Sequence, residues 1–442
     1  MGVERNRYAD LLRVGAIGLV VAGHWLVTAI TYKNGQLSGI DALAAISWGR
    51  WLTWLFQVMP VFFVVGGYAN ATSWTAHRAR GGTWATWLRS RALRLLTPTT
   101  LYVAVAVLAV LAARAAGVSR SEIGEAAWFV GLQLWFLPVY LLLVLLTPAL
   151  LALHARLGVG APLVMVAGVV VVDVGMIGGH LPVIGFANYL LGWGAIFLLG
   201  FAWRDGWLAG RANRYVLGII GVLALAALLA FGPFPVDMIG VSSERVQNAN
   251  PPSVALCAFA AAQTGLLLAV EGAGQRLLAR TRAWRLVSRL NETTMTVYLW
   301  HMLPVVLVAV IIYPAGLMPQ PGVGSWQWWA LRPAWIALLG LVLVPLVVLV
   351  RRLELALDRT ARVGWRGIRR QSAVGGGRWL PWLVAAGVGA DVFALIKITL
   401  TGFAPGGTPS LPVLSLFFGG LILVISSGYP VPTILVARRT SP

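Results

Sequence analysis

Arg13 and His24 are the residues whose types and spacing first suggest chemistry. They lie eleven residues apart in the apolar stretch 10–30, which is about three helical turns, so both side chains share one face about 16 Å apart. The planar guanidinium of arginine suits phosphate, and a neutral histidine can take a proton from a hydroxyl near pH 7. The pair therefore favours an elongated anionic ligand that enters beside Arg13 and reacts at His24. On position alone, Arg13 is also typical of a membrane-surface anchor, and His24 of a hydrogen bond between helices.

Apolar helices must position these residues. Of the 442 residues, 59% are hydrophobic and only 11% are charged, too few charges to cover a soluble protein of this length. Apolar runs of about 20 residues recur along the chain, which predicts an all-α, polytopic membrane protein. The first run is expected to stay as a helix and not to be cleaved as a signal peptide. Twelve spans are predicted, near 11–31, 51–73, 95–116, 128–152, 158–177, 186–203, 214–232, 253–271, 294–314, 332–350, 379–400 and 410–430.

The arginines predict the orientation of these spans. Basic side chains gather at the start of the chain, in the 74–94, 272–293 and 351–378 loops, and at Arg438 and Arg439 of the tail. The intervening loops are nearly free of charge. Basic loops stay in the cytoplasm, so both termini are expected inside, in a bacterial plasma membrane. The net charge of +20 follows from this topology, and the basic residues form no aromatic-interleaved face that would predict nucleic-acid binding.

Other common chemistries lack their motifs. Cys257 is the only cysteine, so no intramolecular disulfide and no cysteine-rich metal site are expected. The chain has no Gly-x-x-x-x-Gly-Lys-Ser/Thr loop, no His-Glu-x-x-His pair and no Gly-x-Ser-x-Gly elbow. We therefore predict no metal site, no permanently bound cofactor, no ATP-driven pump and no serine hydrolase.

Five motifs, in order along the chain, give a family resemblance. Arg7–Arg13 followed by His24 resembles the first helix of the acyltransferase-3 family of integral membrane acyltransferases, which carries an Arg/Lys-x10-His pattern there. The other four are similar to further segments of that family: "MPVFFVVGGYANATSW" (59–74), "RSRALRLLTP" (89–98), "LQLWFLPVYLLLVLLTP" (132–148) and "MTVYLWHMLP" (295–304). Gly66 stands where many members have serine, and Gln133 where some have histidine.

The resemblance implies a domain organisation. It covers about residues 5 to 350, which predicts a ten-helix acyltransferase core over 1–355. An Arg/Gly-rich cytoplasmic linker is expected over 356–378, followed by a C-terminal pair of transmembrane helices with a basic tail over 379–442. The purpose of that last pair does not follow from the resemblance.

The resemblance also implies an activity and a set of site residues. The family transfers an acyl group, often acetyl, from acyl-CoA to a hydroxyl of a surface glycan, a glycolipid or a small natural product. His24 becomes the expected general base, and Asp10 and His301 complete the expected catalytic set. The residues expected to bind the acyl-CoA donor are Arg13, Arg91, Arg94, Gly66, Gly67, Tyr68, Asn70 and Trp135.

Several of these residues also have an ordinary structural explanation. Positive-inside topology accounts for Arg91 and Arg94, close helix packing for Gly66 and Gly67, and interior packing for Trp135. His301, with Tyr298 one turn before it, is equally typical of a hydrogen-bonded structural histidine.

A secondary transporter, or a flippase for lipids or glycans, is the alternative function. Twelve spans with both ends inside suit a transporter, and the buried charges Asp391 and Lys397 are a possible proton path. These two residues are six positions apart, so they are not expected to pair with each other.

Overall fold

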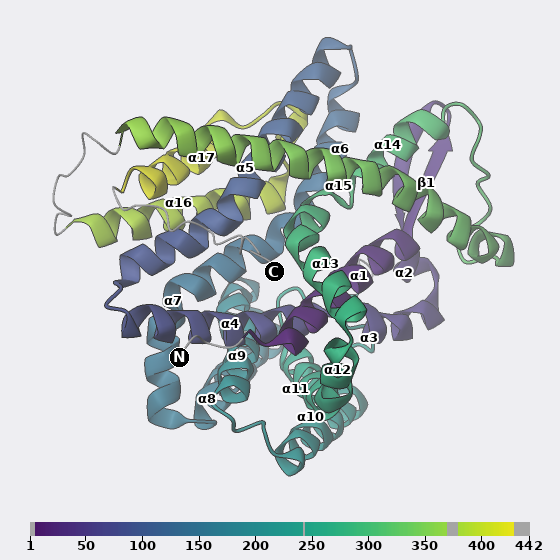
Figure 1. Ribbon diagram of the computed structural model, residues 1–442. Coiled ribbons are helices and arrows are strands. Elements are labelled where there is room, and N and C mark those ends of the chain that lie inside the picture. The colour runs from purple at the N-terminus through teal and green to yellow at the C-terminus, as the bar shows by residue number, and fades with distance from the viewer. Residues whose placement is uncertain (1–4, 242–243, 369–378, 428–442) are drawn as a thin grey trace.

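A computed structural model describes residues 5–241, 244–368 and 379–427, and they form a bundle of helices with one small hairpin (Figure 1). The all-α membrane fold is confirmed. The hairpin consists of β1 (Thr28–Lys33) and β2 (Gln36–Asp41). The helices of the first half are α1 (Arg7–Val27), α2 (Ala42–Ala45), α3 (Thr53–Phe56), α4 (Met59–Ala79), α5 (Trp84–Ala115), α6 (Arg120–Leu132), α7 (Phe136–Leu157), α8 (Gly160–Asp173) and α9 (Ala187–Arg204). Those of the second half are α10 (Arg211–Phe231), α11 (Val254–Ala269), α12 (Glu271–Ala279), α13 (Thr281–Trp300), α14 (Leu303–Ile312), α15 (Trp326–Ile368), α16 (Leu380–Thr401) and α17 (Leu411–Ser426).

The number of membrane crossings can be compared with the expected twelve. Within the described residues, 9 helical segments are long and apolar enough to span a bilayer. Two helix pairs, α11 with α12 and α13 with α14, are bent by 46° and 51°, and they raise the count to 11 if each pair crosses once. Helix α17 is apolar but has only 16 residues. Twelve crossings and the inside position of both termini therefore stay predictions.

The first helix ends earlier than the apolar run suggests. Asn6 caps its start by accepting a hydrogen bond from the backbone N–H of Ala9, and α1 stops at Val27. The chain then enters the β1–β2 hairpin, whose turn is Asn34-Gly35, with φ values of 52° and 79°. Asn-Gly is the preferred pair for a two-residue hairpin turn because both positions need positive φ. The hairpin was missed by the sequence analysis, although this dipeptide signals it.

Helix α1 lies in the middle of the molecule, with α13 beside it (Figure 1). It also packs against α4, α12 and α15. At the start of α14, Pro304 lies in the first helical turn, where a missing N–H costs nothing, and α13 ends at Trp300 just before it. The bend between α13 and α14 therefore falls at His301 and Met302, level with the end of α1.

The C-terminal helices pack on the core. Helix α16 contacts α5, α6 and α7, and α17 contacts α5 and α16 (Figure 1). Helix α15 continues to Ile368, into the segment expected as a linker, whereas residues 369–378 and the basic tail with Arg438 and Arg439 lie outside the described residues.

Arg89 ties the final helix to α5. Its side chain is 3% exposed, and its Nε and Nη2 donate to the carbonyl oxygens of Val424 and Ile425, each at 2.8 Å. Both carbonyls lie in the last turn of α17, where backbone acceptors lack helical partners and a cation is favoured.

Replacing Arg89 by alanine is expected to destabilise the protein by about 3 kcal/mol, because two charge-assisted hydrogen bonds are lost, although the carbonyl oxygen of Val424 still accepts from the Ser427 hydroxyl. Thermal unfolding in detergent, together with protease sensitivity of the segment after Trp379, measures this loss. Arg80→Ala, at an exposed position after α4, is the matched control and should leave both readouts unchanged. Equal behaviour of the two variants would show that Arg89 does not hold α17.

Candidate active site

His24 and His301 form a contact between α1 and the end of α13. The Nδ1 atom of His24 lies 2.8 Å from Nε2 of His301, and the two rings are stacked with centroids 5.1 Å apart. His301 is fully buried, whereas His24 is partly exposed. The structure therefore joins two of the three predicted catalytic residues, although they are 277 positions apart in the sequence.

Hydrogen bonding orders the protons of this pair. Nδ1 of His301 lies 2.8 Å from the carbonyl oxygen of Tyr298, and a carbonyl can only accept, so this nitrogen carries the proton. In the neutral ring, Nε2 of His301 is then an acceptor, and Nδ1 of His24 must donate to it. The remaining nitrogen of His24, Nε2, keeps its lone pair. The arrangement can thus present His24 as a proton acceptor.

Neighbouring groups hold the pair in place. The indole N–H of Trp25 donates to the carbonyl oxygen of His301 at 2.8 Å, and the hydroxyl of Thr28 donates to that of His24 at 2.6 Å. Gln133 donates to the carbonyl oxygen of Leu299 at 2.7 Å, and the Tyr298 hydroxyl donates back to the carbonyl oxygen of Gln133. Gln133, which departs from the family pattern, therefore braces the last turn of α13.

Asp10 and Arg13 form a second polar contact between α1 and α13. Nη1 of Arg13 lies 3.1 Å from Oδ1 of Asp10 and 3.2 Å from Oδ1 of Asn291 on α13. Asn291 also donates to Asp10 at 3.2 Å, and Arg5 forms an ion pair with the same carboxylate. Fourteen helical residues, about 21 Å, separate Asp10 from His24, so the structure does not bring these two predicted catalytic residues together. Instead, Asp10 holds Arg13.

Arg91 and Arg94 lie on α5 near Arg13. Their segment is helical, as the predicted spacing on one face requires. Arg13 is close enough for its charge to act on both, and Tyr140 of α7 lies near the same two guanidinium groups. Among the ion pairs of the described residues, none includes Arg91 or Arg94. Asp10 pairs with Arg13 and Arg5, which leaves the charges of Arg91 and Arg94 without a carboxylate partner among the described residues, and such a cluster of cations attracts a polyanion. We call Arg13, Arg91 and Arg94 the arginine cluster.

Asn70 adjoins this cluster through Tyr140. Its Nδ2 donates to the carbonyl oxygen of Gly66 and to the Tyr140 hydroxyl, each at 2.9 Å, and its buried Oδ1 has no hydrogen-bond partner among the residues that the structure describes. Arg91 donates to the carbonyl oxygen of Ala69 at 3.4 Å. The unpartnered oxygen of Asn70 is therefore available to a ligand donor beside the cations.

The other predicted donor-binding residues lie in packing contacts. A Cβ on Gly67 would come within 2.0 Å of the carbonyl oxygen of Phe197, so glycine is needed where α4 crosses α9. A Cβ on Gly66 would meet the Tyr140 ring at 2.5 Å. Tyr68 packs on Trp203 with centroids 4.5 Å apart, and Trp135 lies 5.6 Å from the Trp193 ring. Helix and ring packing accounts for these four positions.

Asn291 and Tyr140 complete the site and were not anticipated. Asn291 is one polar residue among several at the start of "NETTMTVYLWH", and Tyr140 is one aromatic residue in an apolar run. The spacing of Asn291 offered a signal, because it lies ten residues before His301, nearly the interval that separates Arg13 from His24. Two helices in contact can pair such positions at both ends.

Two other buried carboxylates, Asp173 and Asp391, lie elsewhere in the fold. Asp173 accepts hydrogen bonds from Asn188 and from the backbone N–H of Val254, each at 2.8 Å, and so caps the start of α11. Asp391 is fully buried, its two oxygens have no hydrogen-bond partner in the described part of the chain, and it forms no ion pair there with Lys397. Nowhere in the described residues do three His, Cys, Asp or Glu side chains gather closely enough to hold a metal ion.

Comparison with known proteins gives one family match. A family model described as an acyltransferase domain matches residues 6–352. Searches of curated proteins and of solved structures give no match. The histidine pair and the arginine cluster both lie inside the matched range, and α16 and α17 lie outside it.

Proposed function

The chain belongs to the acyltransferase-3 family, and from this membership we propose that it transfers an acyl group, in particular acetyl, from acyl-CoA to a hydroxyl. It is a membrane acyltransferase. The proposal adds the donor, the acceptor group and the catalytic base, which is His24. We place it in the plasma membrane of a bacterium, where its acceptor is a cell-surface glycan, a glycolipid or a small natural product.

One observation carries this proposal: the arginine cluster and the histidine pair lie at the two ends of a single stripe on α1, about 16 Å apart. CoA is an anion at its phosphates, and its thioester lies at the far end of a long flexible arm. Phosphates bound at Arg13, Arg91 and Arg94 would direct that arm along α1 towards His24.

In the proposed reaction, His24 acts first as a base and then as an acid. Nε2 of His24 takes the proton of the acceptor hydroxyl while the hydroxyl oxygen attacks the thioester carbonyl. The carbon–sulfur bond breaks, the new ester forms, and His24 returns its proton to the CoA thiolate. Throughout, Nδ1 of His24 keeps its hydrogen bond to His301, which stabilises the imidazolium. No metal and no bound cofactor take part in these steps.

Labelled acetyl-CoA supplied to the purified protein in liposomes, with a pool of glycans and lipids, tests the activity. We expect labelled ester in the pool, and at least about 100-fold slower labelling when His24 is replaced by alanine. Gradient-driven uptake of solute without any labelled ester would favour the transporter alternative instead.

Arg91→Ala is expected to raise the KM for acetyl-CoA by about 10- to 100-fold, with kcat little changed. The reason is that a lost charge-assisted contact to a phosphate weakens ground state and transition state alike. Steady-state kinetics with varied acetyl-CoA measures this. Arg282→Ala, an exposed arginine of α13, is the charge-matched control. A KM that rises equally in both variants would attribute the effect to general surface charge.

A further inference from the structure

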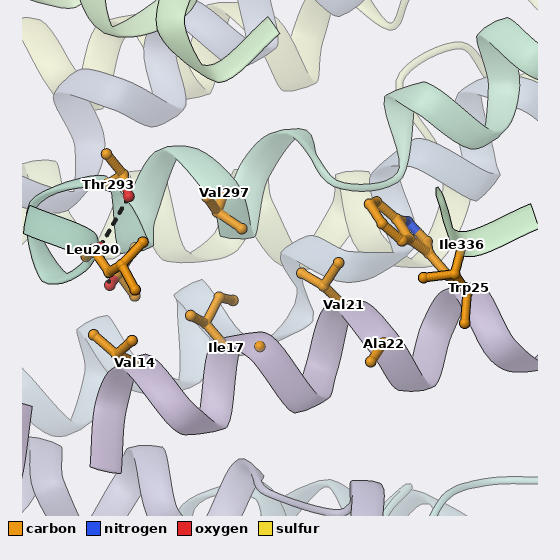
Figure 2. A pocket seen from close by; sticks show the side chains of 11 residues that line it. Val14, Ile17, Val21, Ala22, Trp25, Leu290, Thr293, Val297 and Ile336 are labelled. Carbon is orange, nitrogen blue, oxygen red and sulfur yellow. Dashed lines mark hydrogen bonds between the residues drawn. The ribbon is translucent and has the colours of Figure 1, made fainter. Parts of the chain in front are cut away.

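An apolar groove runs between α1 and α13 (Figure 2). Its volume is about 330 Å³, within the range of small-molecule sites. Helix α1 contributes one wall, α13 the other, and Ile336 of α15 closes one end near Trp25. The only side-chain hydroxyls in the lining belong to Thr293 and Thr294, and both donate to the carbonyl oxygen of Leu290. The groove therefore offers a ligand hydrocarbon contacts alone.

The Arg13–Asn291 contact and the His24–His301 contact lie at the two ends of this groove. Arg13 meets Asn291 beside one end, where Val14 and Leu290 face each other, and His24 meets His301 beside the other, at Trp25. From Val14 to Trp25 is eleven residues of helix, or about 16 Å. A chain that fills the groove thus runs parallel to the stripe from the arginine cluster to the histidine pair.

The groove and that stripe nevertheless lie on different sides of α1. At 100° per residue, the six groove residues of α1 point on average about 100° away from the direction of Arg13 and His24, and Ile17, the nearest of them, about 30° away. An acyl chain extending from a CoA bound at the arginine cluster would follow the stripe and not the groove. The groove is open along Gly18, which is exposed, and α1 is one of the segments able to cross a bilayer. What reaches the groove from that side is membrane hydrocarbon.

We propose that this groove binds the hydrocarbon tail of a lipid-linked acceptor, whose headgroup hydroxyl then reaches Nε2 of His24 past Trp25. This inference rests on the proposed function and narrows its acceptor to an amphiphile: a sugar or other hydroxyl compound on a long alkyl or isoprenoid chain. The tail enters sideways from the bilayer, while acyl-CoA enters at the arginine cluster, so the two substrates approach His24 along separate faces of one helix.

Gly18 allows a selective test. A Cβ built on Gly18 meets no atom within 4 Å, so a leucine there starts from open space and adds bulk to the lining of the groove, and leucine has the higher helix propensity. Gly15, one turn away and also exposed, has the same free space but does not line the groove. Gly15→Leu is therefore the matched control for Gly18→Leu, because both add one leucine to the same helix.

The binding experiment uses dodecyl maltoside with a photoactivatable diazirine in its alkyl chain, added to the full-length protein in phosphatidylcholine nanodiscs. Peptide mass spectrometry should find the label on residues 14–25 and 290–297. We expect Gly18→Leu to reduce that label at least fivefold, and Gly15→Leu and His24→Ala to retain it. Equal labelling of the two leucine variants, or a label elsewhere on the protein, would overturn the proposal.

A kinetic experiment separates this inference from the proposed function. With acetyl-CoA as donor, Gly18→Leu should slow transfer to dodecyl maltoside at least tenfold relative to Gly15→Leu. Dodecyl maltoside partitions equally into the bilayers of both samples, so partitioning does not contribute to this difference. Transfer to dodecyl maltoside that is unaffected by Gly18→Leu refutes the groove and leaves the acyltransferase. Labelling as expected, with no transfer by the wild-type protein to any acceptor, refutes the activity and leaves the groove as a lipid site.

Discussion

His24→Ala is expected to slow acyl transfer by about 10²–10⁴-fold, the contribution of a general base, because the variant lacks the nitrogen that accepts the hydroxyl proton in the proposed path. The loss should appear in kcat, since the arginine cluster, about 16 Å away, still binds the donor. Single-turnover kinetics with labelled acetyl-CoA measures the chemical step directly.

Two further measurements make this result interpretable. Binding of acetyl-CoA to the variant, followed by isothermal titration, should match the wild type, and so should its thermal unfolding temperature within a few degrees. His180→Ala, an exposed histidine outside both clusters, is the control for loss of an imidazole. A folded His24→Ala protein that still transfers acetyl at the wild-type rate would remove His24 from the mechanism.

His301→Ala is expected to lower kcat by about 10²-fold or more, with KM for acetyl-CoA unchanged. His301 does not touch the substrate in the proposed path. Its Nε2 accepts a hydrogen bond from the Nδ1–H group of His24, which keeps the proton on Nδ1 and the lone pair on Nε2 of His24. Losing the group that fixes a catalytic histidine's tautomer is costly, as the triad of serine proteases illustrates.

His301→Gln distinguishes this positioning role from a structural one. The amide oxygen of glutamine can also accept from Nδ1 of His24, so we expect activity within about tenfold of the wild type. His301→Leu has a similar volume and no acceptor, and should behave as His301→Ala. If glutamine and leucine gave equal activity in equally stable proteins, the contact with His24 would have no catalytic part.

Much of the site follows from local sequence. The eleven-residue interval between Arg13 and His24 sufficed to put them on one face, because a helix repeats its geometry regardless of its neighbours. The spacing of Arg91 and Arg94 was informative for the same reason. By contrast, helical spacing could not show that Asp10 pairs with Arg13 and not with His24, because all three lie on one stripe of α1. The distance along the helix axis decides it: Asp10 is one turn from Arg13 but about 21 Å from His24.

Contacts between distant segments were accessible only in part. His24 and His301 were expected in one catalytic set, but their direct contact was not foreseen, because it depends on the bend before Pro304, which an unbroken apolar run conceals. Arg89 belongs to the same motif as Arg91 and Arg94, yet it faces α17, because successive helical residues point in directions 100° apart. Its acceptors are backbone carbonyls, which carry no sequence signature.

The hydrogen bonds from Arg89 to the carbonyl oxygens of Val424 and Ile425 have a consequence for shortened forms of the protein. A chain cut back to its family domain would turn this guanidinium, less than one helical turn from Arg91, towards hydrocarbon. Rotation or sliding of α5 would bring the Arg89 charge to the membrane surface and so avoid the cost of burying it in hydrocarbon. Either motion would also displace Arg91 and Arg94 of the arginine cluster. Helices α16 and α17 thus hold α5 in place, and we expect their removal to raise the KM for acyl-CoA before it affects other properties.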